Sequence, residues 1–309
     1  MYPIHTIDRL QAEGIEYLGT KRKFWFTRED KRRYLFKAEE RGTGEDWAEK
    51  VVCELAALLG LPHVEYELAH EFEADSSIQP GVICPNFAPP PLALVMGNQL
   101  LFRQDSHYPA QSATKYGVRE HTVPAVVKAL AALRPPTREW MRGAPEKVDT
   151  AAGVFCGYVM LDAWVANQDR HHLNWGAIQD ERGALSLAPT YDHGSSLARL
   201  LTDKDRQERL ESRDMNRIIE FFVKRARSGF YLTHDDKKTM LALDVFYWFA
   251  EREPVAAKAW LSKLNSINPE LIDAIASEVP PTRMSPLTKE FTLRLLTINR
   301  QRLLEGYSP

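Results

Sequence analysis

Residues 167–174 read Asn167-Gln168-Asp169-Arg170-His171-His172-Leu173-Asn174, and residues 191–194 read Tyr191-Asp192-His193-Gly194. The segment between them, residues 175–190, has two short apolar runs on either side of the turn-forming residues 180–183, which end in glycine. This pattern predicts a β-hairpin, and a hairpin brings its flanks together. Asn174 and Asp192 are therefore expected to meet at its open end. Their oxygen atoms, with the Asp169 carboxylate, suit a hard cation such as Mg²⁺ and a hydroxyl group that must lose a proton.

This arrangement resembles the catalytic core of the kinase-like superfamily. In that superfamily an Asp orients the acceptor hydroxyl, an Asn five residues later holds metal, and a second Asp after a hairpin also holds metal. The local order Asp-Arg-His-x-x-Asn is similar to that of the HipA-type kinases and of the phosphatidylinositol kinases. The flanking runs favour HipA: they are Leu161-Asp162-Ala163-Trp164 and Leu187-Ala188-Pro189-Thr190-Tyr191-Asp192.

Length and charge set broad limits on the function. The chain has 309 residues, enough for two lobes with a shared cleft, and its net charge of −2 implies no general attraction to nucleic acid or membranes. Residues 1–10 hold no apolar signal core, and the longest apolar run, residues 154–166, is too short to span a bilayer. The cysteines, Cys53, Cys84 and Cys156, are widely spaced and odd in number, which indicates reduced thiols and a cytoplasmic protein.

A candidate phosphate-binding turn lies near the N-terminus. Residues 17–26 are typical of strand, tight turn and strand, with Gly19, Thr20, Lys21 and Lys23 in and beside the turn. The backbone amides of the first two and the ammonium groups of the lysines suit phosphate oxygens. From the residues alone, an ordinary hairpin tip with solvated lysines is the simpler interpretation. HipA-like relatives with a Gly-Thr-Lys or Gly-Ser-Lys turn here bring the phosphate-binding interpretation level with it.

Lys37 ends a third predicted strand, residues 34–37, and resembles the kinase strand lysine that binds the α- and β-phosphates of ATP. Such a lysine pairs with a glutamate on a helix, and a helix is predicted over residues 45–59, ended by a glycine. Glu49 is preferred as the partner, because HipA-type sequences place this glutamate seven residues before the Ala of a Leu-Ala pair. Glu54 remains the alternative.

The second half of the chain is predicted to be mainly helical. Residues 151–166 are apolar on nearly every face, as a buried central helix must be, and deliver the polar loop at their C-terminal end. After Asp192 come Gly194, Ser195 and Ser196 and then the charged segment 202–213; this polar stretch has no strong period and is expected to be an activation segment. A basic cluster follows at residues 224–227, either as a solvated helix end or as a receptor for an acidic substrate or a phosphorylated loop. Proline-interrupted helices are predicted near 237–251, 255–265, 269–278 and 286–304.

The resemblance implies an α+β fold with the two lobes of a protein kinase. A small antiparallel β N-lobe with one helix, residues 1–91, would bind nucleotide. A mainly helical C-lobe, residues 92–309, would hold the catalytic and metal-binding loops. The proline run at residues 89–91 marks the expected hinge between them. The chain leaves no room for the extra N-terminal subdomain of HipA proper, so a short member with the kinase domain alone is expected.

The function that the resemblance implies is ATP- and Mg²⁺-dependent phosphorylation of serine or threonine in a protein substrate. Asp169 would orient and deprotonate the acceptor hydroxyl, Asn174 and Asp192 would hold Mg²⁺, and Lys37, positioned by Glu49, would bind ATP. Several members of the family are toxins of toxin–antitoxin pairs, so an antitoxin partner is a further expectation. No direct contact with nucleic acid or a membrane is expected.

Two other functions stay open at this stage. A lipid or small-molecule kinase is one, because the Asp-Arg-His-x-x-Asn motif also resembles the phosphatidylinositol kinases, although no membrane-binding helix or strongly basic face supports it. The other is a nucleotide-binding pseudokinase that acts through partner contact. The presence of Lys37, Asp169, Asn174 and Asp192 together argues against it, because a degenerate site usually lacks one of these residues.

Overall fold

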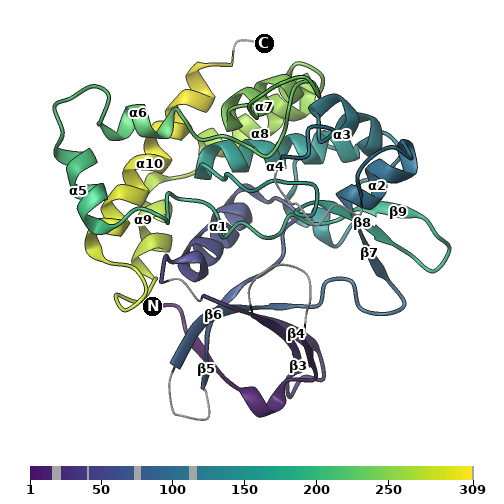
Figure 1. Ribbon diagram of the computed structural model, residues 1–309, viewed down its shortest axis with the longest axis horizontal. Coiled ribbons are helices and arrows are strands. Elements are labelled where there is room, and N and C mark those ends of the chain that lie inside the picture. The colour runs from purple at the N-terminus through teal and green to yellow at the C-terminus, as the bar shows by residue number, and fades with distance from the viewer. Residues whose placement is uncertain (16–21, 40–41, 73–77, 111–116, 308–309) are drawn as a thin grey trace.

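A computed structural model describes residues 1–15, 22–39, 42–72, 78–110 and 117–307. The chain forms two parts (Figure 1): a curled β-sheet carrying the first long helix, and a larger, mainly helical part that packs beside it. The mixed α and β architecture expected from the sequence is confirmed. Within the described ranges no helix combines the length and apolarity that crossing a bilayer requires.

The first part is a six-stranded sheet in the order β1-β5-β6-β4-β3-β2. Its strands are β1 (Ile4–Asp8), β2 (Gly14–Ile15), β3 (Lys23–Thr27), β4 (Arg33–Ala38), β5 (Glu67–Phe72) and β6 (Ile78–Pro85). All neighbours pair antiparallel except β1 and β5, which run parallel, so the expected antiparallel sheet gains a parallel edge strand that the sequence analysis did not predict. Alternating aromatic residues of β3 and β4, Phe24, Phe26 and Phe36, are buried together on one face of the sheet.

Helix α1 (Glu45–Leu59) covers the other face and has the predicted bounds. It ends at Gly60, which takes a left-handed conformation with φ +71 and donates its amide to the Ala57 carbonyl. A side chain there would be strained by the backbone and would also meet the Gly143 carbonyl, because a Cβ would stand 2.0 Å from that oxygen. The glycine therefore fixes where the chain leaves the helix.

The predicted hairpin is present. Strands β8 (Gly176–Gln179) and β9 (Leu185–Leu187) pair antiparallel, and Gly183 in the turn has φ +81. Strand β7 (Ala93–Met96), which follows the proline run, pairs antiparallel with β8 to complete a three-stranded sheet. The connection between the two sheets therefore runs through the proline-rich segment.

Helix α4 (Ala151–Val165) lies at the centre of the helical part and is almost wholly buried. Trp164 has no exposed surface and donates its indole N–H to the Leu296 carbonyl, which joins α4 to the C-terminal helix. Ala166 ends α4 in a left-handed conformation with φ 54, and its amide bonds to the Asp162 carbonyl. The polar loop starts directly after this turn, so a rigid, buried helix sets its position.

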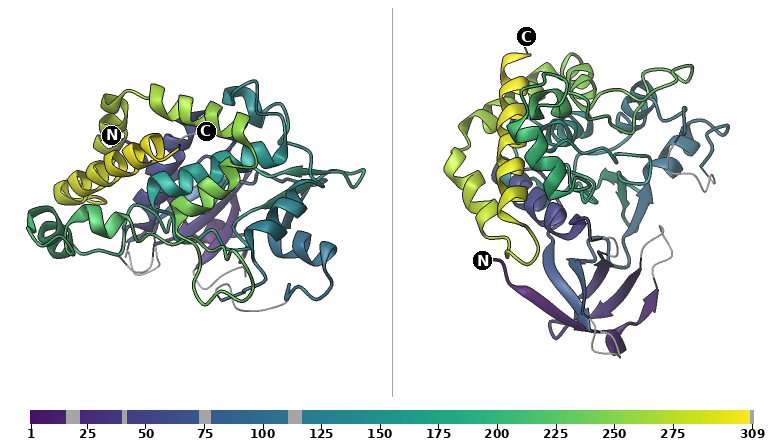
Figure 2. Two further views of the ribbon diagram at one scale, coloured as in Figure 1. Left: turned by 90° about the horizontal axis from the view of Figure 1, so that it is seen from above. Right: turned by 60° about the vertical axis from the view of Figure 1, so that its left-hand side comes forward.

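The other helices surround α4, as the two views of Figure 2 show. They are α2 (Gly97–Gln104), α3 (Val123–Leu130), α5 (Asp203–Glu211), α6 (Ile219–Val223), α7 (Ala242–Ala250), α8 (Pro254–Ser266), α9 (Pro269–Ser277) and α10 (Pro286–Glu305). Helix α5 lies in the charged segment 202–213, for which the sequence predicted no helix. Its N-terminus is held by a capping box in which the Thr202 hydroxyl accepts from the Asp205 amide and the Asp205 carboxylate accepts from the Thr202 amide.

Candidate active site

A cavity of about 420 Å³ lies between the six-stranded sheet and the three-stranded sheet, a volume typical of small-molecule sites. Apolar side chains in its lining include Leu35, Phe87, Leu94 and Leu173, and charged or polar ones include Lys23, Lys37, Asn174 and Asp192. Both parts of the fold therefore contribute to one cavity, and it combines apolar walls with cations and oxygen donors.

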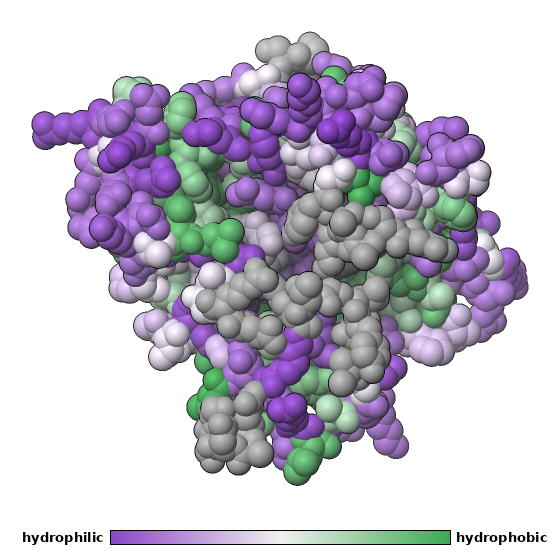
Figure 3. Space-filling model, viewed as in Figure 1, coloured by the Kyte–Doolittle hydropathy of each residue, from purple (hydrophilic) through white to green (hydrophobic). Residues whose placement is uncertain are grey.

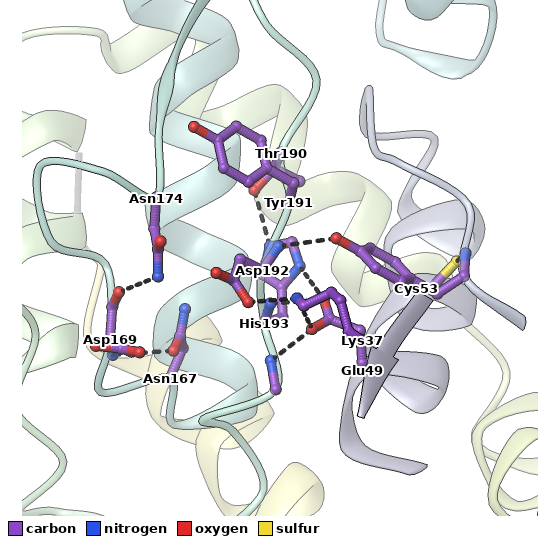
Figure 4. Close-up of polar contacts among 12 residues, drawn as sticks. Lys37, Glu49, Cys53, Asn167, Asp169, Asn174, Thr190, Tyr191, Asp192 and His193 are labelled. Carbon is purple, nitrogen blue, oxygen red and sulfur yellow. Dashed lines mark hydrogen bonds and ion pairs between the residues drawn. The ribbon is translucent and has the colours of Figure 1, made fainter. Parts of the chain in front are cut away.

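Lys37 contacts two carboxylates from distant parts of the chain. Its Nζ lies 2.6 Å from Asp192 Oδ1 and 3.2 Å from Glu49 Oε2. In Figure 4 one carboxylate oxygen of Asp192 meets Lys37, and the other is directed towards the loop that carries Asn174 and Asp169. Glu54 lies elsewhere, in an ion pair with Lys50 at 2.6 Å. The geometry thus distinguishes the two candidate glutamates and brings Glu49 to the lysine.

Glu49 also holds the segment that follows Asp192. Its Oε1 accepts from the His193 amide at 2.7 Å and its Oε2 accepts from the Gly194 amide at 3.0 Å (Figure 4). Asp192 itself takes a left-handed conformation with φ 60, which is strained for a residue with a side chain. Its amide donates to the Tyr66 hydroxyl at 3.3 Å. Hydrogen bonds from α1 and from Tyr66, the residue before β5, thus maintain the backbone that presents Asp192.

The loop carrying Asp169 is held by its own amides. Asn167 Oδ1 accepts from the Asp169 amide at 3.1 Å, and Asn174 Nδ2 donates to the Asp169 carbonyl at 2.8 Å. Asp169 Oδ2 accepts from the Ser195 hydroxyl at 3.4 Å, whereas its buried Oδ1 has no hydrogen-bond partner in the described part of the chain and lies 3.6 Å from His171 Nε2. The carboxylate is therefore oriented while one oxygen keeps its capacity to accept a proton.

Arg170 connects the loop to its surroundings from a fully buried position. It makes a bidentate pair with Asp162 of α4, with both N···O distances at 2.8 Å. It also donates to the Asn174 carbonyl at 2.6 Å and to the Thr190 hydroxyl at 2.9 Å. Asp162, a buried carboxylate within an otherwise apolar helix, therefore has a structural role, with the side chains of Arg170 and Asn167 as its partners. One guanidinium thus fixes the loop relative to α4 and to the end of the hairpin.

Ion pairing keeps Lys37 and Asp192 in their charged forms. Burial opposes the charged form of Lys37, but the neighbouring carboxylates Asp192 and Glu49 outweigh it and raise the lysine pKa. Burial likewise works against ionised Asp192, and Lys37 and Lys23 together hold its pKa well below the usual range. Cys84, which also lines the cavity, behaves differently: burial raises the pKa of its thiol to about 12. The site thus holds an ion-paired cluster beside an un-ionised thiol.

Solvent exposure distinguishes the side chains that could contact a ligand from those that only support them. The side chains of Asp192 and Asp169 are 34% and 19% exposed, whereas Lys37 is 12% and Glu49 only 2% exposed. Lys23, the cross-strand neighbour of Lys37, lines the same cavity. The remaining predicted residues of the N-terminal turn, Gly19, Thr20 and Lys21, lie outside the described residues.

The cavity walls were not identified from the sequence. Tyr66 lies under Lys37, with Nζ 5.3 Å from the ring centroid, and Trp25 and Phe87 line the cavity near it. These residues look like ordinary strand aromatics, and nothing in their spacing marks them as ligand contacts. The one available signal was position: Phe87 comes two residues before the proline run of the expected hinge.

The donor set fits a divalent cation bound together with phosphate. Asn174 uses its amide nitrogen to hold the Asp169 carbonyl, so its Oδ1 is the atom left to act as a ligand, and Asp192 supplies a carboxylate in the same cavity. Mg²⁺ in nucleotide sites is held by one or two protein oxygens together with phosphate oxygens. Lys23 and Lys37 provide positive charge for such phosphates.

The fold is similar to that of solved structures, among them the following two. The Helicobacter pylori proinflammatory kinase CtkA aligns with 99% of this chain and 100% of its own, with a TM-score of 0.70 and 21% identity. HipA of the Shewanella oneidensis MR-1 toxin–antitoxin system, solved with HipB and operator DNA, aligns with 95% of this chain and 65% of its own, with a TM-score of 0.57 and 12% identity. No protein-family model and no curated protein matches the sequence. Identities this low establish architecture, and at that level the expected resemblance to HipA-type proteins is confirmed: the chain has the kinase-like fold that CtkA and HipA share.

Proposed function

We propose that this protein is an ATP- and Mg²⁺-dependent kinase that transfers the γ-phosphate to a serine or threonine hydroxyl of a protein substrate. The observation that carries the proposal is the convergence of Lys37, Asn174 and Asp192 on one cavity, with Asp169 directly beside Asn174 on the loop. The shared fold with a protein named as a kinase supports the same reaction class.

Asp169 acts as the residue that orients the acceptor hydroxyl and takes its proton. Its Oδ2 already accepts a hydrogen bond from a serine hydroxyl, that of Ser195, which is the chemical group the acceptor would present. Its backbone is fixed on both sides by amide side chains, so little reorientation is needed when substrate binds.

Lys37 and Lys23 donate to phosphate oxygens, and Glu49 keeps Lys37 in position. Asn174 Oδ1 and Asp192 hold Mg²⁺, which when bound neutralises charge on the phosphates. Gly19, Thr20 and Lys21 belong to the same proposal as the turn over the phosphates. The work of the protein is then positioning and charge stabilisation.

The proposal divides the chain at the proline run. Residues 1–91 form the nucleotide-binding lobe, and residues 92–309 form the lobe with the catalytic and metal-binding loops. The two separate sheets, one before the prolines and one after them, support this division. Three free cysteines, all buried, support a cytoplasmic location, where thiols stay reduced.

A toxin role with an antitoxin partner is the finer part of the proposal. It rests on the fold shared with HipA, which was solved with HipB. Growth arrest on expression of the wild-type chain, absent with Asp169→Asn, supports this role. Equal growth with both chains contradicts it.

Two variants test the chemistry. Asp169→Asn keeps the shape of the loop but lacks the base, so it should bind ATP with wild-type affinity and transfer phosphate at least about a hundredfold more slowly. Asp192→Ala should lose the Mg²⁺-dependent part of ATP affinity as well as transfer. Calorimetric titration of ATP with and without Mg²⁺, followed by a transfer assay with labelled ATP, measures both. Wild-type turnover in either variant would refute the assignment.

The location of the label distinguishes the alternatives. After incubation with labelled ATP and cell lysate, label in protein bands supports the protein kinase, and label in the organic extract supports a lipid kinase. ATP binding without transfer to either fraction supports the pseudokinase.

A further inference from the structure

A second cavity, of about 380 Å³, lies next to the loop that carries Asp169. Helices α5 and α6 and the chain between them form most of it, and both helices pack against α10, on the left of Figure 1. Gln168, the residue before Asp169, belongs to its lining together with Ala166 and Ala198. A group bound in this cavity would therefore lie beside the acceptor position of the proposed reaction.

The charge of this cavity is one-sided. Three arginines line it, Arg209, Arg217 and Arg225, and none of the described lining residues is an aspartate or glutamate. In Figure 3 this side of the molecule is largely hydrophilic, with apolar side chains set among the polar ones. We name this feature the arginine cavity. Its lining attracts anions and offers no carboxylate to compensate for the arginines.

Aromatic stacking orients two of these arginines. The Arg209 guanidinium lies over the Phe222 ring at 4.5 Å, and the Arg225 guanidinium lies over the Phe221 ring at 5.4 Å. A guanidinium that stacks by its face keeps its N–H edge available for a planar or tetrahedral anion. Arg209 Nε is buried and has no hydrogen-bond partner within the described part of the chain. An unpaired buried donor of this kind indicates a group that a ligand would complete.

The neighbouring charges compensate for the arginine cavity only in part: Asp205 of α5 attracts Arg209, but it lies outside the lining and accepts hydrogen bonds from Thr202. Arg217 has only a marginal ion pair with Asp214, 4.0 Å long and between exposed side chains. Glu220 of α6 is engaged with Arg294 at 2.8 Å. The basic residues at 224–227 have different surroundings: Arg225 lines the cavity, whereas Arg227 donates to the Thr239 carbonyl. The cavity combines arginines from three positions that are not contiguous in the sequence.

We propose that the arginine cavity binds an acidic or phosphorylated side chain that lies a few residues from the acceptor serine or threonine in the protein substrate. An extended chain advances about 3.3–3.6 Å per residue, so a few residues span the distance between neighbouring sites on one face. A phosphorylated residue should bind more tightly than a carboxylate, because it brings a larger charge and more acceptor oxygens. This inference rests on the proposed kinase function, since it names the class of substrate for that site.

Binding is measured first, without nucleotide, so that the result does not depend on catalysis. The probes are short fluorescent peptides with one acceptor serine and either phosphoserine, aspartate or asparagine at each nearby position in turn. Fluorescence polarisation with the wild-type chain should show phosphoserine peptides binding at least about tenfold more tightly than asparagine peptides, with aspartate peptides in between. Equal affinity for all three overturns the proposal.

The variant that tests the assignment is the double replacement Arg209→Gln/Arg225→Gln, and the matched control is Arg227→Gln. The double variant should lose the preference for acidic peptides, and the control should keep it. Because Arg209 is partly buried, with its Nε inaccessible to solvent, the single variant Arg225→Gln is included as well. The Arg225 side chain is exposed, so this variant should lose part of the preference with an unchanged melting temperature. An unchanged preference in the double variant, or displacement of the peptides by a labelled RNA oligonucleotide that binds the same arginines, overturns the proposal.

A transfer assay on the same peptides separates this inference from the proposed function. Arginine-dependent binding with no phosphate transfer overturns the kinase function and leaves the anion site standing. Transfer with equal rates for acidic and neutral peptides overturns the anion site and leaves the kinase function standing. Faster transfer to acidic peptides, lost in the double variant, supports both.

Discussion

Lys37 and Asp192 are 155 positions apart in the sequence, and their side chains form an ion pair with Nζ 2.6 Å from Oδ1. The lysine comes from strand β4, and the aspartate comes from the segment after the hairpin of the other sheet. Because Glu49 contacts the lysine and also two amides after Asp192, the three residues act as one unit. Replacing any one of them should therefore shift the positions of the other two.

Glu49→Gln tests this unit. The glutamine keeps the size of the side chain but presents an N–H group where the glutamate accepts from Lys37 and from backbone amides. We expect Asp192 to shift and the rate of phosphate transfer to fall about a hundredfold, because small misplacements of reacting groups have effects of this order. Turnover and the KM for ATP measure the effect.

The matched control for that variant is Glu54→Gln on the same helix. Glu54 loses only its ion pair with Lys50 four residues earlier, which stabilises the helix by about 0.3–0.5 kcal/mol. Transfer should stay at the wild-type rate. Equal losses in both variants would contradict the special position of Glu49.

The buried pair of Arg170 and Asp162 should be strongly coupled. Arg170→Met leaves Asp162 with an unpaired buried charge, which costs about 3–5 kcal/mol of unfolding free energy. Adding Asp162→Asn removes that charge, so the double variant should be more stable than the sum of the single losses predicts, by about 1–3 kcal/mol. Denaturant unfolding of the four proteins measures the coupling, and additive losses would rule it out.

Gly229→Ala should disturb the loop that carries Asp169 from outside the cavity. A Cβ at this position would lie 2.7 Å from the Arg170 carbonyl oxygen and 2.9 Å from the His171 amide, and backbone atoms have little room to move. We expect a loss of about 1–3 kcal/mol in stability together with slower transfer. Gly14→Ala is the control, because its nearest neighbour would be the end of the Arg33 side chain at 4.0 Å. A wild-type melting temperature and rate for Gly229→Ala would contradict the close contact.

Acid should destabilise the protein through His121. Burial lowers the pKa of this imidazole to about 3, against an ordinary value of 6.5. Between those values the unfolded chain binds a proton and the folded chain does not, so stability falls as the pH decreases from 6.5 towards 3. His172, whose pKa burial lowers to about 4, adds to the same trend. The unfolding free energy should therefore decrease steadily as the pH is lowered from 6.5 towards 3.

His121→Gln removes one of these protons. The slope of unfolding free energy against pH should decrease by the equivalent of about one proton between pH 6 and 4. Stability at neutral pH should also fall, because His121 accepts from the Trp175 indole and stacks on Phe230. The control is His234→Gln, on an exposed side chain, which should keep the wild-type stability at neutral pH. An unchanged slope in His121→Gln would show that another group is responsible.

The fold was predictable where one local signal acted alone. The bounds of α1 follow from the helix-ending Gly60, and the hairpin follows from Gly183 between two apolar runs. Helix α5 was missed because its sequence has almost no apolar face. It is held by the Thr202 capping box and by the hydrogen bond from the Thr288 hydroxyl to Asp203, and that second contact comes from a distant helix.

The residues of the two cavities likewise fall into those that a local sequence signal predicts and those that only the assembled fold brings together. Asp169, Asn174 and Asp192 could be identified as candidates from motif spacing. The hairpin between Asn174 and Asp192 brings these residues towards one another within a short stretch of sequence. The arginine cavity could not, since Arg209 and Arg225 meet only when α5 and α6 pack on α10. Parallel pairing of β1 with β5 is likewise a property of the assembled sheet.

The thiol of Cys84 can report on motions that open the cavity. Its side chain is buried at the floor between the sheet and the hairpin, and its thiol stays protonated at neutral pH. Maleimide reagents react with exposed thiolates, so modification at this position requires a motion of the cavity walls that exposes the thiol. With Cys53 and Cys156 replaced by alanine, the rate of alkylation would measure how often that motion occurs.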